Sequence, residues 1–126
     1  MTRPELPADV RRFILTSIPS VPYLEAVLLL RGEPGTAWGV AELARRLYVP
    51  ERTATELLEL LTASGIAERF RETGTARYAP SPELREVVEQ LAHAYSTDLV
   101  AITDLIHSRI DRRAQRFADA FRFRKE

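Results

Sequence analysis

The chain has 126 residues, which is long enough for one domain with a hydrophobic core but too short for two. Eighteen basic residues balance eighteen acidic ones, there is no cysteine, and no apolar run reaches the roughly 20 residues needed to cross a bilayer. These features exclude disulfide scaffolds and thiolate metal sites, and they predict a globular cytoplasmic protein with no secretory signal and no membrane contact. The charge balance is also local, since residues 1–80 carry ten charges of each sign and residues 81–126 carry eight of each.

The first part of the chain predicts two helices separated by a proline-rich break. Apolar residues recur at helical spacing between residues 8 and 18. Residues 19–22 contain two prolines, and Ser20 is expected to cap the helix that follows. That second helix, over residues 23–31, is apolar nearly all round, so it should be buried against several neighbours. Residues 1–22 are therefore assigned to an N-terminal helix and linker.

Two further helices joined by a short turn are expected between residues 39 and 64. Trp38 lies in a short extended segment, and Gly39 caps a helix over residues 40–47. Tyr48 and Val49 form the turn, and residues 50–64 form the second helix. Gly65 stops that helix at a position that commonly requires positive φ.

A small hairpin and a final long helical segment complete the chain. Residues 66–71 and 76–79 are expected to be two short strands around a glycine turn. Ser81 then caps a helix that has Pro82 at its first position. From Glu83 to the end there is neither proline nor glycine, and apolar residues recur with nearly constant helical phase.

These recurring apolar residues form a stripe along the C-terminal segment, and the stripe predicts a dimer. One continuous helix to Phe121 would be about 60 Å long, at about 1.5 Å per residue, and a domain of this size cannot cover that length alone. Alternatively, residues 96–98 cap a new helix and permit a bend. In either case a second chain is expected to cover the stripe, so residues 81–126 are assigned to a dimerisation helix with a basic-aromatic tail. The predicted interface consists of Leu84, Val88, Leu91, Tyr95, Leu99, Ile102, Ile106 and Ile110.

The order of these elements resembles a known class of DNA-binding domain. The pattern that carries the resemblance is Leu43-Ala44, Leu47, Val49, Ala54, Leu57-Leu58, Leu61 and Gly65-Ile66. It resembles the winged helix-turn-helix over about residues 23–80, and with the long C-terminal helix the chain looks like the small dimeric bacterial regulators of the broad MarR-like and PadR-like type. The resemblance implies a mainly α fold with a small β-hairpin wing. It also implies that the second helix of the pair enters the major groove while the wing touches the DNA backbone or minor groove.

Eight residues are candidate contacts to double-stranded DNA on this reading. They end the first helix of the pair, point outward from the second, or flank the hairpin turn: Arg45, Arg46, Arg52, Thr53, Thr55, Arg69, Arg71 and Arg77. Alternation along a two-stranded ribbon predicts that Arg69 and Arg71 share one face.

The leading functional prediction is a homodimeric DNA-binding transcription regulator. The alternative is a winged-helix module that dimerises or binds another protein and has little or no DNA affinity. Three carboxylates, Glu51, Glu56 and Glu59, on the outward side of the second helix favour the alternative, because phosphate repels them. A variant of the first reading is a ligand sensor whose pocket includes Trp38, Tyr48, Tyr78 and Tyr95.

Neither catalysis nor metal binding is expected. His93 and His107 are the only histidines, and fourteen residues of helix separate them by about 21 Å. Asp98, Asp104 and Asp111 lack a neighbouring nucleophile or a glycine-rich phosphate loop. The sequence therefore predicts no enzyme activity, no metal site and no cofactor.

Overall fold

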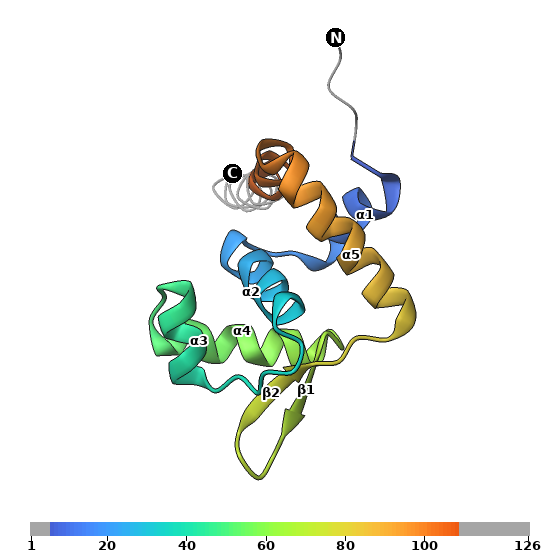
Figure 1. Ribbon diagram of the computed structural model, residues 1–126. Coiled ribbons are helices and arrows are strands. Elements are labelled where there is room, and N and C mark those ends of the chain that lie inside the picture. Colours follow the sequence, from blue (N-terminus) through green and yellow to red (C-terminus); the bar gives the residue numbers. More distant parts are fainter. Residues whose placement is uncertain (1–5, 109–126) are drawn as a thin grey trace, which may run out of the picture.

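Helices account for most of the structure, and a single hairpin projects from one end (Figure 1). The computed structural model describes residues 6–108, which form six helices and one two-stranded antiparallel sheet. The expected mainly helical fold with a small hairpin is confirmed. In chain order the elements are α1 (Ala8–Ser17), α2 (Val21–Gly32), α3 (Val40–Leu47), α4 (Glu51–Ala63), β1 (Ala67–Phe70), β2 (Thr75–Tyr78) and α5 (Pro82–Thr97), followed by an unlabelled helix, Leu99–Ser108.

The helix ends follow the local signals in the sequence. The Ser20 hydroxyl accepts a hydrogen bond from the Tyr23 backbone N–H at the start of α2, and Ser81 caps α5 in the same way. Gly39 is the N-cap of α3. Gly65 follows α4 with φ +81°, a conformation in which a side chain would be strained. These four predicted boundaries are confirmed.

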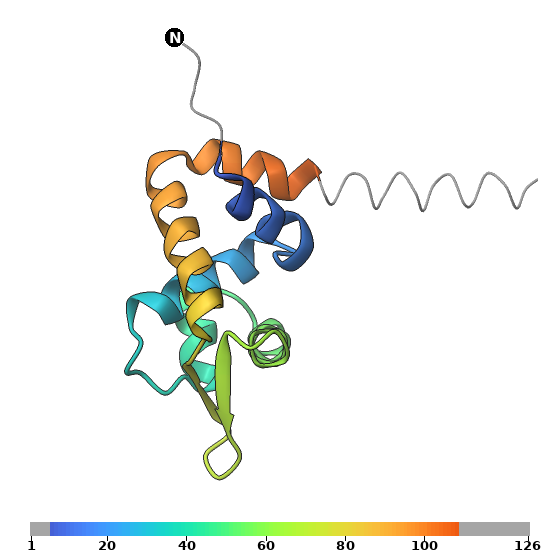
Figure 2. The ribbon, with the colours of Figure 1, turned by 90° about the vertical axis from the view of Figure 1, so that its right-hand side faces the viewer.

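Helix α2 lies at the centre of the fold. It packs against α3, α4, α5 and β2, which explains why it is apolar nearly all round. On one side of α2 lie α3, α4 and the hairpin, and on the other lie α1 and α5, as Figures 1 and 2 show. The buried side chains form one continuous cluster that includes Ile14, Leu24, Trp38 and Leu58.

The hairpin is anchored to the body through Trp38. Strand β1 pairs with β2 so that Arg69 lies opposite Ala76 and Glu68 lies opposite Arg77. On its other edge, β2 exchanges two backbone hydrogen bonds with Trp38, from Trp38 N to Ala76 O at 2.7 Å and from Ala76 N to Trp38 O at 2.9 Å. The expected extended segment at Trp38 is thus confirmed, and the Trp38 side chain is fully buried.

The prediction of a single continuous C-terminal helix is wrong, because the chain bends at Asp98. There the backbone leaves helical geometry, with φ −150° and ψ 68°. The Asp98 carboxylate oxygen Oδ1 accepts a hydrogen bond from the Ala101 backbone N–H at 3.1 Å, so Asp98 caps the next helix. The alternative of a bend at residues 96–98 is therefore the one that the structure adopts.

The bend also corrects the predicted dimer interface. It turns Leu99–Ser108 across the N-terminal part of the chain (Figure 2), and Ile102 and Ile106 join Val10 and Ile14 in one buried cluster. Four predicted interface residues are completely buried within one chain: Val88, Leu91, Ile102 and Ile106. Leu84 and Tyr95 are half-buried against that core, Leu99 is 48% exposed, and Ile110 lies outside the described residues.

Helix α1 packs on α5, so Val88 and Leu91 are buried without a second chain. Apolar spacing along the C-terminal segment indicates burial but does not identify α1 as the element that covers it.

Within residues 6–108, no single helix is both long and apolar enough to span a membrane. Helices α1 and α2 reach the necessary length and composition only as a pair, across a bend of 118°.

Candidate nucleic-acid interface

The turn between α3 and α4 has an unusual backbone conformation. Tyr48 ends α3 with φ 57° and ψ 45°, in the left-handed region, and its N–H donates to the carbonyl oxygens of Ala44 and Arg45. The Val49 N–H donates to the Ala44 carbonyl oxygen at 3.1 Å. These bonds satisfy the last carbonyl groups of α3 and let α4 pack directly on α3. Glycine commonly occupies such a position, so Tyr48 adopts it at an energetic cost.

The outward side of α4 presents few donors. Pro50 is its N-cap and provides no side-chain hydrogen bond. Thr53 and Thr55 are half-buried, and the Thr55 hydroxyl donates to the Glu51 carbonyl oxygen of its own helix at 3.0 Å. Arg52 has a side chain that is 92% exposed and lies 3.8 Å from the Glu56 carboxylate. Of the three candidate residues on this helix, only Arg52 projects freely into solvent.

The two arginines at the end of α3 are held in ion pairs on the surface. Arg45 donates to the Glu42 carboxylate one turn earlier, and Arg46 donates to Glu33 in the loop that follows α2. The Arg46 guanidinium also lies over the Trp38 ring, 5.3 Å from its centroid. Because exposed ion pairs contribute only about 0–1 kcal/mol, a phosphate group can replace the carboxylate partner at small cost.

The three hairpin arginines do not form one cluster. Residues 71–74 form the turn, so Arg71 lies beyond the end of β1. Arg69 and Arg77 point to opposite faces, because Arg69 is paired with Ala76, one residue away from Arg77. Arg77 lies over the Phe70 ring at 5.2 Å. The prediction that Arg69 and Arg71 share a strand face is therefore wrong, since the strand ends at Phe70.

Arg69 and Arg71 are nevertheless the least constrained cations in the described part of the chain near α4. Both are exposed, and neither side chain makes a hydrogen bond or an ion pair with another residue between positions 6 and 108. The hairpin projects away from the end of the molecule formed by α1 and α5 (Figures 1 and 2). This arrangement leaves both guanidinium groups available to an external anion.

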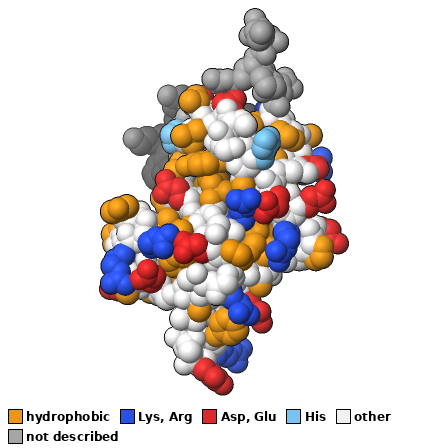
Figure 3. Space-filling model, in the orientation of Figure 1, with side chains coloured by type: hydrophobic (Ala, Val, Ile, Leu, Met, Phe, Trp, Pro, Cys, Tyr) orange, Lys and Arg blue, Asp and Glu red, His pale blue; other side chains and the backbone are white. Residues whose placement is uncertain are grey.

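The surface as a whole is not basic. On the face in Figure 3, arginines alternate with carboxylates and form no patch of one sign. The described residues, 6–108, carry ten basic and fourteen acidic side chains. Residues 109–126 carry seven basic and three acidic ones, including Arg116, Arg122, Arg124 and Lys125 of the predicted basic-aromatic tail, which lies outside the described residues. The excess of basic residues is therefore confined to the last eighteen positions, and it is balanced by acidic residues between positions 81 and 108.

The aromatic residues considered for a ligand pocket differ widely in burial, and Tyr95 is half-buried. Trp38 and Tyr78 are core residues, whereas Tyr48 is exposed. The structure contains a different groove, of about 350 Å³, between α1 and α5, which is lined in part by Asp9, Phe13, Glu83 and Val87. Within the described ranges, no three His, Asp or Glu side chains lie close enough together to bind a metal ion.

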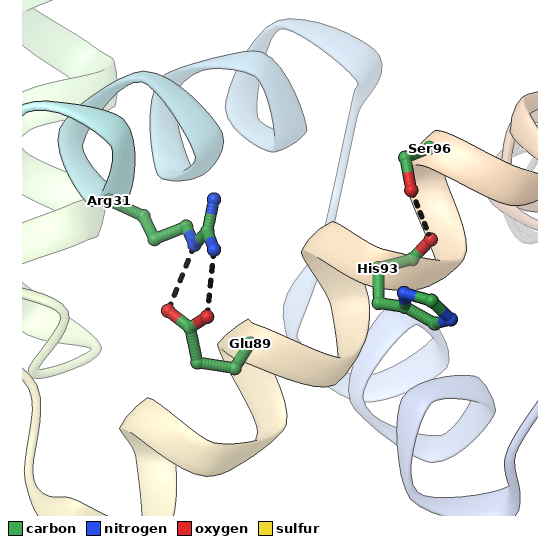
Figure 4. A network of polar contacts seen from close by, with 4 residues as sticks. All are labelled: Arg31, Glu89, His93 and Ser96. Atoms are coloured by element: carbon green, nitrogen blue, oxygen red, sulfur yellow. Dashed lines mark hydrogen bonds and ion pairs between the residues drawn. The ribbon is translucent and has the colours of Figure 1, made fainter.

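The bidentate ion pair between α2 and α5 is structural. Arg31 of α2 donates two hydrogen bonds to the Glu89 carboxylate of α5, at 2.9 and 2.7 Å, as Figure 4 shows beside the local contact of Ser96 with the His93 carbonyl oxygen. These hydrogen bonds lower the pKa of Glu89 and raise that of Arg31 from their ordinary values. The pair joins α2 to α5 and contributes nothing to the candidate interface.

Comparisons of the chain with models of known protein families, with curated proteins and with solved structures found no match. A functional assignment therefore depends on the geometry and charges of the chain itself.

Proposed function

We propose that this protein is a DNA-binding transcription regulator of the winged-helix type. The observation that supports this most is the combination of α3, the left-handed turn at Tyr48, α4 and a hairpin that bears two exposed arginines, Arg69 and Arg71, whose side chains pair with no other residue between positions 6 and 108. An α-helix fits the major groove of B-DNA, which is about 12 Å wide. In this proposal α4 enters that groove, and β1–β2 is the wing that contacts the backbone.

The electrostatics of the proposal depend on a few arginines. Phosphate neutralisation supplies most non-specific affinity for DNA, and it makes binding depend strongly on salt. Among residues 6–108, Arg69 and Arg71 have no ion-pair partner to lose, and Arg45 and Arg52 pair with the exposed carboxylates of Glu42 and Glu56. We expect these four side chains to make the phosphate contacts. Arg46 and Arg77 lie against aromatic rings and are expected to contribute less.

A homodimer remains part of the proposal, with a revised surface. Leu99 and Val100 are 48% and 55% exposed at the start of the last described helix, and they are two of the four large apolar side chains that residues 6–108 expose. Leu99→Asp and Val100→Asp should yield a folded monomer, because neither side chain is needed for the core. Light scattering is the measurement, and a wild-type protein that is monomeric at all concentrations would contradict the dimer.

A protein-interaction module is the second candidate, and one observation favours it. The described residues have four more acidic than basic side chains, and Glu51, Glu56 and Glu59 are all exposed on α4. A helix with this charge is repelled by phosphate but suits a basic partner protein.

Salt-dependent DNA binding separates the two candidates. The test variant is Arg69→Ala/Arg71→Ala, and the matched control is Arg11→Ala/Arg12→Ala, which removes two exposed arginines from α1. For a winged-helix regulator, the slope of log affinity against log salt should fall by about one per lost phosphate contact in the test variant only. Equal slopes in both variants and wild type would show that the hairpin arginines do not contact DNA phosphates. An equal reduction in both variants would mean that the attraction to DNA is diffuse.

A further inference from the structure

Tyr48 combines two unfavourable properties. It is the only described non-glycine residue with positive φ, and such a conformation costs a side chain roughly 1–2 kcal/mol. The residue is also 95% exposed, the highest exposure among the large hydrophobic residues that the structure describes. The phenol therefore contributes almost no packing to offset the backbone cost. Strained backbone conformations cluster at functional sites.

The position of Tyr48 suggests what it contacts. It lies in the turn between Arg45, whose side chain is 75% exposed, and Arg52, whose side chain is 92% exposed. Within residues 6–108 its hydroxyl makes no hydrogen bond. An apolar partner would have to desolvate the flanking guanidinium groups, which is costly. An anionic surface instead can replace the exposed carboxylates that pair with both arginines and can accept a hydrogen bond from the Tyr48 hydroxyl.

We propose that the Tyr48 hydroxyl donates a hydrogen bond to a phosphate oxygen of duplex DNA when α4 docks. This inference rests on the proposed function and adds to it a contact that the resemblance does not assign. Tyrosine hydroxyls are among the groups that hydrogen-bond phosphates in protein–DNA complexes. A hydroxyl donor is not a cation, so the contact adds affinity without releasing a counterion. Loss of this contact should therefore weaken binding without changing the salt slope, whereas loss of an arginine contact changes both.

The experiment measures anisotropy titrations of full-length protein with a random-sequence duplex at several salt concentrations, together with thermal unfolding. The variants are Tyr48→Phe, which removes only the hydroxyl, and Tyr48→Gly, which also relieves the left-handed backbone. Thr16→Val is the matched control, because it removes an exposed hydroxyl from α1, which packs on α5. We expect both Tyr48 variants to bind about tenfold more weakly with an unchanged salt slope. Tyr48→Gly should unfold at the same or a higher temperature than wild type.

Three results would overturn the inference. If wild type binds and Tyr48→Phe binds equally well, the hydroxyl makes no contact, although the proposed function stands. If Tyr48→Phe weakens binding and lowers the unfolding temperature by several degrees, the hydroxyl acts within the fold and not on DNA. If wild type does not bind at low salt, the proposed function itself fails and this contact fails with it.

Discussion

Replacing Ile102 with alanine tests whether the C-terminal stripe is the core of one chain or a surface between two. Ile102 is completely buried, in the same cluster as Val10 and Ile14. Removing three buried carbon atoms from such a site costs the transfer free energy plus that of the cavity, about 2–4 kcal/mol in total. Domains of this size have about 5–15 kcal/mol of stability, so the variant should fold but unfold at clearly lower urea concentration.

The assay is urea unfolding followed by circular dichroism, repeated over a hundredfold range of protein concentration. Leu60→Ala is the matched control, because it removes a large aliphatic side chain from α4, where it is 46% exposed, and it should cost less than about 1 kcal/mol. If Ile102 lies in the core of one chain, the decrease in the free energy of unfolding caused by Ile102→Ala does not depend on protein concentration. A loss below about 1 kcal/mol, or one that disappears on dilution, would refute the intramolecular burial of the helix that contains Ile102.

Three further changes probe the contacts that hold the fold. Gly65→Ala should cost about 1 kcal/mol in urea unfolding, because φ is +81° and nothing lies within 4 Å of the added carbon, and an unchanged stability would contradict that reason. Tyr23→Phe should cost about 1 kcal/mol, because it removes the 2.8 Å hydrogen bond to Ser64, and a double-mutant cycle with Ser64→Ala checks that the loss is shared. Glu89→Gln should cost up to about 1 kcal/mol at pH 7, since the ion pair with Arg31 is partly exposed. The hydrogen bonds from Arg31 lower the pKa of folded Glu89, so the pair stabilises above the ordinary value near 4.3 and its contribution is lost as pH falls through the lowered pKa. A deficit in Glu89→Gln that stays constant from pH 7 to about pH 3 would contradict this assignment.

The features that could be predicted from the sequence are local. A serine before a helical pattern and a proline at its start fix the beginnings of α2 and α5 within a few residues, because the capping bond spans only three positions. Gly65 likewise fixes the end of α4 through its own backbone freedom. The mainly helical fold with one hairpin follows from these capping and helix-ending residues and from the apolar spacing between them.

The features that could not be predicted depend on which elements meet in space. The apolar phase of Val88, Leu91, Ile102 and Ile106 indicates burial but does not identify α1 as the partner. The ion pair of Arg46 joins it to Glu33, thirteen residues away, and spacing along a helix cannot reveal it. Alternation along a strand does not predict the orientation of Arg71, because β1 ends one residue earlier, at Phe70, and Arg71 lies in the turn.

The most direct test of the central claim is a fluorescence-anisotropy titration of the wild-type protein with random duplex DNA in about 50 mM and about 200 mM salt. If Arg45, Arg52, Arg69 and Arg71 each neutralise one phosphate, affinity between the two conditions should fall about a hundredfold for one bound protomer and about 10⁴-fold for the homodimer. Binding that collapses in this way supports a winged-helix regulator and justifies a search for its operator. Absence of binding at about 50 mM salt would contradict DNA recognition by α4 and the hairpin and would favour a partner protein instead.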